Sequence, residues 1–297
     1  MEKRKSVCFI INPASGNQDP FFDQIETKFK NSFFDYQIAI TKGSTDAFNF
    51  AKAVKDKVDL IVVYGGDGTV MQVARALFKS ETPLAIIPGG TANIVAKEFK
   101  IPLDPIEALD IIKSGKWTFK KIDMGVVNDI PFLIRINLGI MADMVLEADR
   151  ELKNSLGQLA YGVTTVKTIA NASPIYIDMV IDGTIVSESA VSLTITNTGN
   201  IGWEGFTFLP GIDVADGKLD VVLLNEVSFF NLIKLTGTTL LQTDSEVLKH
   251  WSCKKMNLKT HEKFRCIIDD ESYESDELQI EVIPAALKVL IPYVSKD

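Results

Sequence analysis

The chain has few of the residue types that build covalent crosslinks and metal centres. It has three cysteines, Cys8, Cys253 and Cys266, and two histidines, His250 and His261, in 297 residues. The cysteines are widely spaced and form no Cys-x-x-Cys pair, so we expect neither a disulfide framework nor a structural zinc site. The histidines lack partners at ligand spacing, so we expect both to be non-catalytic.

Long apolar runs and an excess of basic residues are also missing. No uninterrupted apolar stretch approaches the roughly 18 residues of a membrane-spanning helix, so the sequence predicts no transmembrane segment and no signal peptide. The formal net charge of −8 argues against a nucleic-acid-binding surface. We therefore expect a soluble, cytoplasmic protein with no nucleic-acid partner.

The first part of the chain alternates between two kinds of pattern. Apolar runs lie at 7–11, 36–40, 60–64 and 84–87, and amphipathic segments lie near 20–30, 44–56, 70–79 and 92–99. This alternation is typical of βαβ units on a parallel sheet. A hydrophobic content of 46% over 297 residues is enough for two well-filled cores.

Strand-like segments dominate after residue 125. They lie at 131–138, 175–181, 185–196, 219–224, 263–268, 278–283 and 287–291, with helical patterns at about 143–170 and 229–239. Asp182-Gly183 is typical of a hairpin turn. We predict an α/β nucleotide domain at 1–125 and a mostly antiparallel β-sandwich domain at 126–297. The sequence leaves open whether the C-terminal tail returns to the first domain.

Three apolar runs of the first domain end in turns that contain glycine. These turns are Asn12-Pro13-Ala14-Ser15-Gly16, Gly65-Gly66-Asp67-Gly68-Thr69 and Pro88-Gly89-Gly90-Thr91-Ala92-Asn93. Glycine lets an anion approach backbone N–H groups closely, and ligands bind at the carboxyl ends of parallel strands. Thr69 and Gln72 have the spacing of a capping box, which predicts a helix N-terminus at the second turn. The pattern indicates a nucleotide-phosphate site.

These motifs, in this order and spacing, resemble the diacylglycerol kinase catalytic family, which includes bacterial lipid kinases and sphingosine kinases. The resemblance continues through Asp216-Gly217-Lys218-Leu219-Asp220 and Asp269-Asp270-Glu271, so it covers nearly the whole chain. It implies an active site in the cleft between the two domains. NAD kinases and phosphofructokinases share the central turn, but we do not expect them to share the late motifs.

The resemblance implies a set of residues that contact ATP. They are Asn12, Pro13, Ala14, Ser15, Gly16, Thr41, Gly65, Gly66, Asp67, Gly68, Thr69 and Thr91. Asn12 and Thr91 have a further argument, because a buried polar side chain beside a glycine turn needs a partner that nucleotide oxygens would provide. Thr41 also fits an ordinary strand end before a glycine turn.

Phosphoryl transfer needs a base that orients the attacking hydroxyl. The resemblance implies Glu271 as the proton acceptor, and Asp67 as either the base or a group that organises Mg²⁺ and water. Asp270 stands where the bacterial family has glycine, and we expect it to adopt the left-handed conformation. Three adjacent carboxylates would raise at least one pKa in a desolvated site. The alternative is an acidic, solvated hairpin tip.

Two further sites are implied by the resemblance. Asp213, Asp216 and the carbonyl of Lys218 fall on a motif that binds a structural Mg²⁺ in the bacterial enzymes, although Asp216-Gly217 also fits a simple turn. Asp143, at the end of Gly139-Ile140-Met141-Ala142-Asp143, matches an aspartate that contacts the lipid head in the sphingosine kinase branch. An aspartate at a helix start is also an ordinary cap.

The sequence thus predicts an ATP- and Mg²⁺-dependent lipid kinase that reaches its substrate by peripheral membrane contact. The predicted acceptor is a hydroxyl of diacylglycerol, giving phosphatidate. The alternatives are a sphingoid-base kinase, an NAD kinase and a non-catalytic nucleotide- or lipid-binding regulator. The oligomeric state stays open, a homodimer included.

Overall fold

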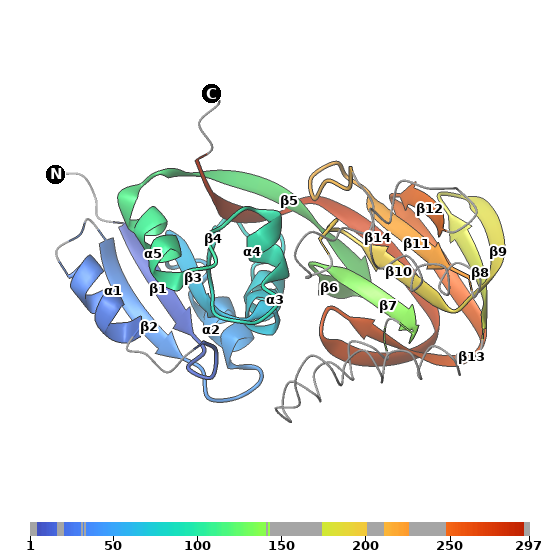
Figure 1. The fold of residues 1–297 in the computed structure, drawn as a ribbon, viewed down its shortest axis with the longest axis horizontal. Coiled ribbons are helices and arrows are strands. Elements are labelled where there is room, and N and C mark those ends of the chain that lie inside the picture. The colour runs from blue at the N-terminus through green and yellow to red at the C-terminus, as the bar shows by residue number, and fades with distance from the viewer. Residues whose placement is uncertain are drawn as a thin grey trace, which may run out of the picture. The chain divides into compact units, whose positions relative to one another are not determined.

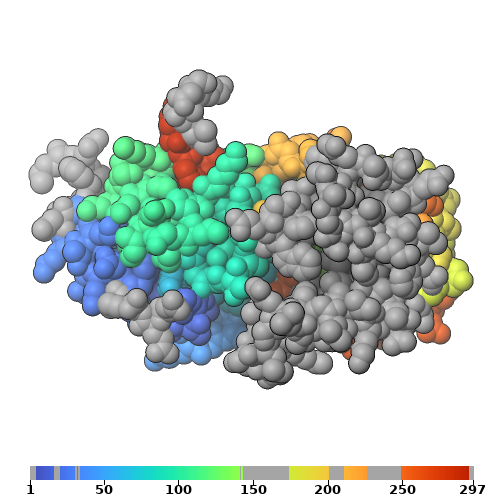
Figure 2. Space-filling view, in the orientation of Figure 1, coloured from blue at the N-terminus to red at the C-terminus, as the bar shows by residue number. Residues whose placement is uncertain are grey.

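The computed structural model describes residues 5–16, 21–30, 32, 34–140, 142, 174–200, 211–225 and 248–293. The rest of the chain is grey in Figures 1 and 2. The chain divides into two compact units. Unit 1 comprises Met1–Met124, Thr198–Asp216 and Ile283–Asp297, and unit 2 comprises Gly125–Asn197 and Gly217–Val282.

Unit 1 is built on a parallel sheet with the strand order β4-β3-β1-β2. The strands are β1 (Lys5–Ile11), β2 (Phe34–Ile40), β3 (Leu60–Gly65) and β4 (Leu84–Pro88). The end of β14 (Glu271–Pro292) joins the sheet beside β4, with Val289 opposite Leu84 in parallel pairing. Every residue of β3 and β4 is buried, which explains why both strands are uninterrupted apolar runs.

Helices cover both faces of this sheet (Figure 1). They are α1 (Phe21–Phe29), α2 (Asp46–Val54), α3 (Asp67–Ala76), α4 (Ile94–Glu98) and α5 (Pro105–Ser114). Helix α2 packs on α3, and α1 packs on α5. In the sheet, the connection from β1 to β2 and the connection from β3 to β4 run in opposite directions. Because such connections are right-handed, α1 and α3 lie on opposite faces of the sheet. This reversal makes a topological switch point between β1 and β3, the usual place for a ligand.

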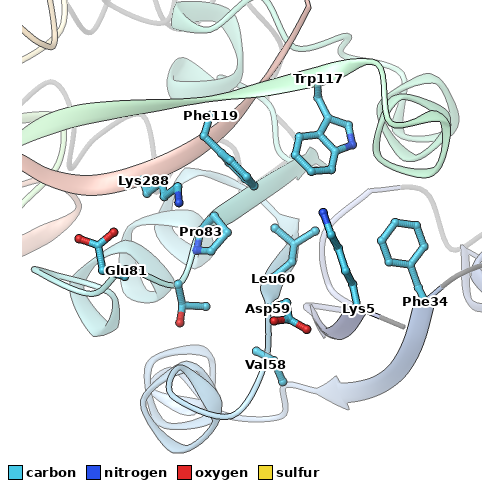
Figure 3. Close-up of a pocket in the computed structure, with 11 residues that line it drawn as sticks. Lys5, Phe34, Val58, Asp59, Leu60, Glu81, Pro83, Trp117, Phe119 and Lys288 are labelled. Carbon is cyan, nitrogen blue, oxygen red and sulfur yellow. The ribbon is translucent and has the colours of Figure 1, made fainter. Parts of the chain in front are cut away.

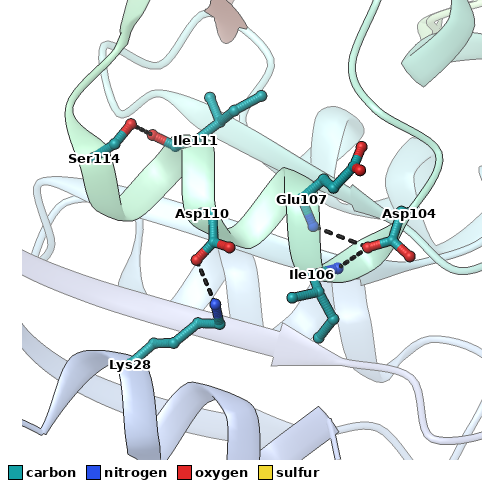
Figure 4. Close-up of polar contacts among 7 residues, drawn as sticks. All are labelled: Lys28, Asp104, Ile106, Glu107, Asp110, Ile111 and Ser114. Atoms are coloured by element: carbon teal, nitrogen blue, oxygen red, sulfur yellow. Dashed lines mark hydrogen bonds and ion pairs between the residues drawn. The ribbon is translucent and has the colours of Figure 1, made fainter.

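Helix α5 is not among the predicted elements, although its signals are present in the sequence. The Asp104 carboxylate accepts hydrogen bonds from the amides of Ile106 (2.8 Å) and Glu107 (2.9 Å), and Pro105 is the first helical residue. Gly115 ends the helix with φ +71°. An ion pair between Lys28 and Asp110 links α5 to α1 (Figure 4).

Unit 2 is an antiparallel β-sandwich. Its strands are β6 (Ile130–Phe132), β7 (Arg135–Gly139), β8 (Ile175–Ile181), β9 (Thr184–Ala190), β10 (Ser192–Thr196), β11 (Leu219–Leu224), β12 (Leu248–Cys253) and β13 (Lys255–Ile268). Strands β5 (Trp117–Val127) and β14 contribute residues to both units. The pairing order is β12-β11-β10-β7-β13-β14, and β8 pairs with both β13 and β9. Phe132, Ile136, Leu193, Val221 and Leu258 are fully buried in its core.

The predicted fold class is therefore confirmed: a parallel α/β part followed by an antiparallel sandwich. The turn at Asp182-Gly183 is also confirmed, since Ile181 pairs with Thr184 around φ values of +46° and +88°. The predicted strand at 185–196 is instead two strands, β9 and β10, because the chain turns at Val191. Strands β5 and β12 are not among the predicted elements. The helical patterns at 143–170 and 229–239 lie outside the described residues.

No helix in the described part of the chain has the length and apolar character needed to span a bilayer.

Candidate functional site

The turn after β1 is joined to the turn after β3 by side-chain hydrogen bonds. Asn12 donates from Nδ2 to Thr69 Oγ1 at 3.0 Å, and its Oδ1 accepts from the Ala14 amide at 3.0 Å. Ser15 Oγ accepts from the Gly66 amide at 3.3 Å. The partner that Asn12 needs is thus supplied by the protein, and its amide organises two turns at the switch point. Contact between Asn12 and ATP stays a prediction.

Backbone packing joins the turn after β3 to the turn after β4. The Gly89 amide donates to the Gly65 carbonyl at 2.9 Å. A Cβ added at Gly90 would lie 2.6 Å from the Gly66 Cα, a distance that side-chain carbons do not adopt. Glycine is therefore required here by the close approach of two backbones.

Helix α3 begins at Asp67, directly after the extended Gly66 N-cap (φ −80°, ψ 179°). The capping box of Thr69 and Gln72 is therefore wrong. Thr69 is the third helical residue and its hydroxyl is bound by Asn12, while Gln72 Nε2 donates to the Ser44 carbonyl at 2.5 Å. Because the N-cap is a glycine, it has no side chain to satisfy the first-turn amides. The positive end of the α3 dipole lies at this edge of the sheet, as an anion site requires.

The turn after β4 is shaped by Asn93, which is 8% exposed and left-handed at φ +48°. Its Oδ1 accepts from the Gly90 amide at 3.0 Å, and its Nδ2 donates to the Gly90 carbonyl at 2.7 Å. Asp67 Oδ1 accepts from the Val95 amide at 3.5 Å, so its carboxylate faces the start of α4. Thr91 is exposed in this turn, so the argument that it is a buried polar side chain in need of a partner is wrong. Asn93 is part of the quoted motif, but the sequence does not indicate its positioning role.

Tyr64, at the end of β3, is a second positioning residue that the sequence did not indicate. Its ring stacks on Phe21 with centroids 4.2 Å apart, and its hydroxyl donates to the Ser15 carbonyl at 3.2 Å. Burial raises the pKa of Tyr64, so the hydroxyl stays a donor. Gly16 has φ +79°, and a Cβ there would meet the Tyr64 hydroxyl at 2.2 Å.

Thr41 lies beside the same turn. It is buried, and its amide donates to the Ile11 carbonyl at 2.9 Å. The chain that follows is held by Asp46, whose Oδ2 accepts from the amides of Lys42 (2.8 Å) and Gly43 (2.9 Å). These two bonds lower the pKa of Asp46. Thus Thr41 and the three glycine turns occupy one edge of the unit 1 sheet.

Glu271 lies in unit 2, on the hairpin between β13 and β14. The turn is anchored by the buried Asp269, whose carboxylate accepts from the amides of Leu133 (3.0 Å), Ile134 (2.8 Å) and Arg135 (3.1 Å). Asp270 and Glu271 are exposed. Glu271 is thus an exposed residue, two positions after the anchored Asp269.

Two expectations for this hairpin are wrong. The left-handed residue is Asp269 (φ +58°), not Asp270, so aspartate in place of the family glycine carries no left-handed strain. The three carboxylates also do not share one desolvated site, because Asp269 is 8% exposed and bound to amides while its two neighbours are exposed. Asp269 turns inward because its carboxylate is bound by the amides of Leu133, Ile134 and Arg135.

The proposed magnesium residues lie on one exposed stretch of chain. Asp213 Oδ1 accepts from the Ala215 amide at 3.1 Å and from Lys120 Nζ at 3.3 Å. The described residues contain no cluster of three or more histidine, cysteine or acidic side chains placed to hold a metal. A cation held by Asp213, Asp216 and the Lys218 carbonyl stays a prediction. Asp143 lies outside the described residues.

Asp220, the last residue of that motif, has a different environment. It is buried on β11, and its Oδ1 lies 2.6 Å from both His250 Nε2 and Ser252 Oγ on β12. This cluster crosslinks two paired strands of unit 2.

Comparison with known proteins identifies the family. Residues 6–127 match the diacylglycerol kinase catalytic domain, and residues 135–291 match the YegS C-terminal NAD kinase beta sandwich-like domain. A diacylglycerol kinase of Bacillus subtilis (strain 168) is 26% identical over 276 residues, covering 90% of each chain. One of Mycobacterium tuberculosis (strain H37Rv) is 29% identical over 258 residues, covering 82% of this chain and 80% of the relative.

A solved structure from Bacillus anthracis str. Sterne has the same fold, with a TM-score of 0.81 and 27% identity over 97% of this chain and 98% of the other. A second, a diacylglycerol kinase from the same organism, has a TM-score of 0.76 at 23% identity, covering 97% of each chain. The chain therefore belongs to the diacylglycerol kinase catalytic family and is a lipid kinase.

Proposed function

We propose that this lipid kinase transfers the γ-phosphoryl group of ATP to a hydroxyl of diacylglycerol and releases phosphatidate. The observation that carries the proposal is the joined set of three glycine turns at the carboxyl ends of β1, β3 and β4, beside the uncapped start of α3. The two named relatives from Bacillus subtilis and Mycobacterium tuberculosis are diacylglycerol kinases, which supports this acceptor.

The turns supply the phosphate side of the reaction. The Gly16 amide and the first-turn amides of α3 bind phosphate oxygens, and the hydroxyls of Thr69 and Thr91 add donors. Thr41 contributes from the end of β2 at the same edge. When bound, ATP supplies the γ-phosphoryl group and Mg²⁺ neutralises the charge that develops on its oxygens. Asp67 would hold this metal and its water, and Asp213, Asp216 and the Lys218 carbonyl would hold a separate structural Mg²⁺.

Glu271 acts as the base. Its carboxylate accepts the proton of the acceptor hydroxyl as that oxygen forms its bond to phosphorus, while the bond from phosphorus to the leaving ADP oxygen breaks. Asp269 positions this glutamate, because its carboxylate accepts three hydrogen bonds from backbone amides and so holds the turn. Asp143 binds the polar head of the lipid. The enzyme meets the bilayer by peripheral contact during turnover.

A transfer assay tests the proposal. The full chain is incubated with Mg²⁺ and radiolabelled ATP in mixed micelles that contain diacylglycerol, monoacylglycerol, sphingosine or NAD. The expected result is labelled phosphatidate from diacylglycerol, abolished by chelation of Mg²⁺. Transfer to sphingosine or NAD instead would overturn the proposed acceptor. ATP binding without transfer to any acceptor would favour a non-catalytic regulator.

A further inference from the structure

Unit 1 contains a cavity at the opposite edge of its sheet from the glycine turns. Its volume is about 360 Å³, and it is lined by the first residues of three parallel strands, Lys5, Phe34 and Leu60, together with chain from 81–83 and residues of β5 and β14 (Figure 3). Strand β3 has six residues, so at ~3.3 Å per residue the two edges are separated by roughly 20 Å. The cavity is therefore separate from the proposed phosphate site.

Two aromatic rings form one wall of this cavity. Trp117 and Phe119 are two residues apart on β5, point to the same side of the strand, and have ring centroids 4.9 Å apart. Trp117 Nε1 donates to the Ile112 carbonyl at 3.0 Å, which fixes the indole so that its polar edge faces away from the cavity. The buried Leu60 and Pro83 add apolar surface. The wall is preorganised to contact an apolar group.

Two ammonium groups lie over these rings. Lys5 Nζ is 5.3 Å from the Trp117 ring centroid, and Lys288 Nζ is 4.7 Å from that of Phe119. Among the described residues, neither ammonium forms an ion pair with a carboxylate. Both therefore remain able to pair with an anion, which binds an ammonium more strongly than a neutral ring does.

The two acidic residues of the lining already have partners. Asp59 Oδ2 accepts from the Ser6 amide at 2.8 Å and from the Ser6 hydroxyl at 3.0 Å. Glu81 pairs with Lys121 at 3.0 Å, and this bond is the main cause that lowers the pKa of Glu81. The Lys288 ammonium also lowers it, by a smaller amount. The donors to Asp59 are neutral, so its carboxylate keeps its charge. Because Lys121 offsets Glu81, the two ammonium groups of Lys5 and Lys288 exceed the remaining lining carboxylate by one positive charge, in a chain whose formal net charge is −8.

We propose that this cavity binds an amphipathic anion, an acidic head group carried on an apolar body. The head group pairs with Lys5 and Lys288, and the body lies along Trp117 and Phe119. A free inorganic anion would leave the aromatic wall unused, and an apolar cation would face two ammonium groups. A volume of about 360 Å³ suits one small ligand. The source is either a free amphiphile or a lipid head at a bilayer surface.

The test uses octyl phosphate as the probe. Inorganic phosphate, which lacks the apolar body, and octyltrimethylammonium, which carries the opposite charge, are the control ligands. Calorimetry on the full chain is expected to show saturable binding of octyl phosphate, at least tenfold weaker binding of phosphate, and none of the cation. The double variant Lys5→Gln/Lys288→Gln and the variant Phe119→Ala should each weaken octyl phosphate binding at least tenfold. Lys255→Gln/Lys259→Gln, at two exposed lysines of unit 2, is the charge-matched control for the double variant and should bind like the parent.

Vesicles then distinguish the two sources. If phosphatidylcholine vesicles containing phosphatidate bind the parent but not the double lysine variant, the ligand is a bilayer lipid. If octyl phosphate binds and the vesicles do not, it is a free amphiphile. The proposal is overturned if octyl phosphate does not bind, or if it binds equally to the parent and to variants whose thermal unfolding is unchanged.

Discussion

Asn12 donates a hydrogen bond from Nδ2 to Thr69 Oγ1 across 3.0 Å, and this bond ties the turn after β1 to the first turn of α3. Removing the acceptor should loosen both turns. Thr69→Val keeps the shape of the side chain but leaves the amide of Asn12 without this partner. We expect a loss of about 1 kcal/mol in the free energy of unfolding and at least tenfold weaker ATP binding.

Thr69→Ser is the control, because it keeps the hydroxyl. It should retain ATP affinity within a few fold of the parent when both are titrated by calorimetry. Equal ATP binding by the valine variant would show that the bond does not organise the site.

Gly90→Ala tests the contact between the second and third turns. The new Cβ would lie 2.6 Å from the Gly66 Cα, so one turn must move. We expect ATP binding to fall at least tenfold while the far-ultraviolet circular dichroism spectrum stays that of the parent. Gly43→Ala is the matched control, because the added Cβ would lie at an ordinary van der Waals distance, 3.6 Å from Asp46 Oδ1. If both alanine variants bind ATP like the parent, the close packing of the turns is irrelevant to binding.

The parts of the fold that the sequence predicts are those in which burial alone decides the pattern. Strands β3 and β4 are buried on both faces and so are uninterrupted apolar runs. Strand β12 is different: it carries Lys249, His250 and Ser252 and is held by its pairing with β11, a partner about thirty residues earlier in the sequence. A local pattern carries no information on such a partner. Helix α5 is different again: its Asp104-Pro105 start and Gly115 end are typical helix boundaries, so local signals in the sequence do mark it.

Asp269→Asn tests how the hairpin is held. An amide has one oxygen where the carboxylate has two, so fewer of the three backbone donors keep an acceptor. Asparagine tolerates the φ of +58° as aspartate does, so the substitution adds no backbone strain. We expect urea denaturation to show a loss of about 1–3 kcal/mol, and kcat to fall more than the KM for ATP rises.

Asp270→Gly restores the glycine of the bacterial family at the next position. Because Asp270 is not left-handed, the substitution relieves no strain there. We expect stability to be equal or lower by up to about 1 kcal/mol, owing to the added freedom of glycine in the unfolded chain. A clear gain in stability on urea denaturation would mean that aspartate is strained in this turn.

The stability of the protein is expected to depend on pH through two buried thiols. Burial raises the pKa of Cys253 and of Cys266 from 9.0 to about 12. A raised folded-state pKa contributes stability that is fully present below pH 9.0 and is lost as the pH rises toward 12. We expect the free energy of unfolding to fall by up to ~1 kcal/mol per thiol for each pH unit in this window. Cys253→Ala should flatten the fall.

Labelling of the native thiols gives a second measurement of the same property. Both should react with a thiol reagent at pH 8 far more slowly than in the urea-unfolded chain, because the reactive thiolate is rare in the folded state. Rapid native labelling of Cys253 or Cys266 would contradict their burial.

The candidate site shows the same division between what the sequence predicts and what it does not. Three glycine turns at one edge follow from three parallel strands, so their neighbourhood is predictable. The separation of Gly66 from Gly90 and the role of Tyr64 depend on tertiary packing. The inward turn of Asp269 depends on Leu133, Ile134 and Arg135, more than 130 residues earlier in the chain, which no local pattern identifies.

The most direct test of the proposed function separates ATP binding from transfer in Glu271→Gln. The variant keeps the size of the side chain but cannot accept the proton of the hydroxyl, so transfer to diacylglycerol should fall at least 10²-fold while ATP affinity stays within a few fold. Asp270→Asn, the exposed neighbour, is the matched control and should transfer like the parent. Transfer by Glu271→Gln at the parent rate would contradict the assignment of Glu271 as the base.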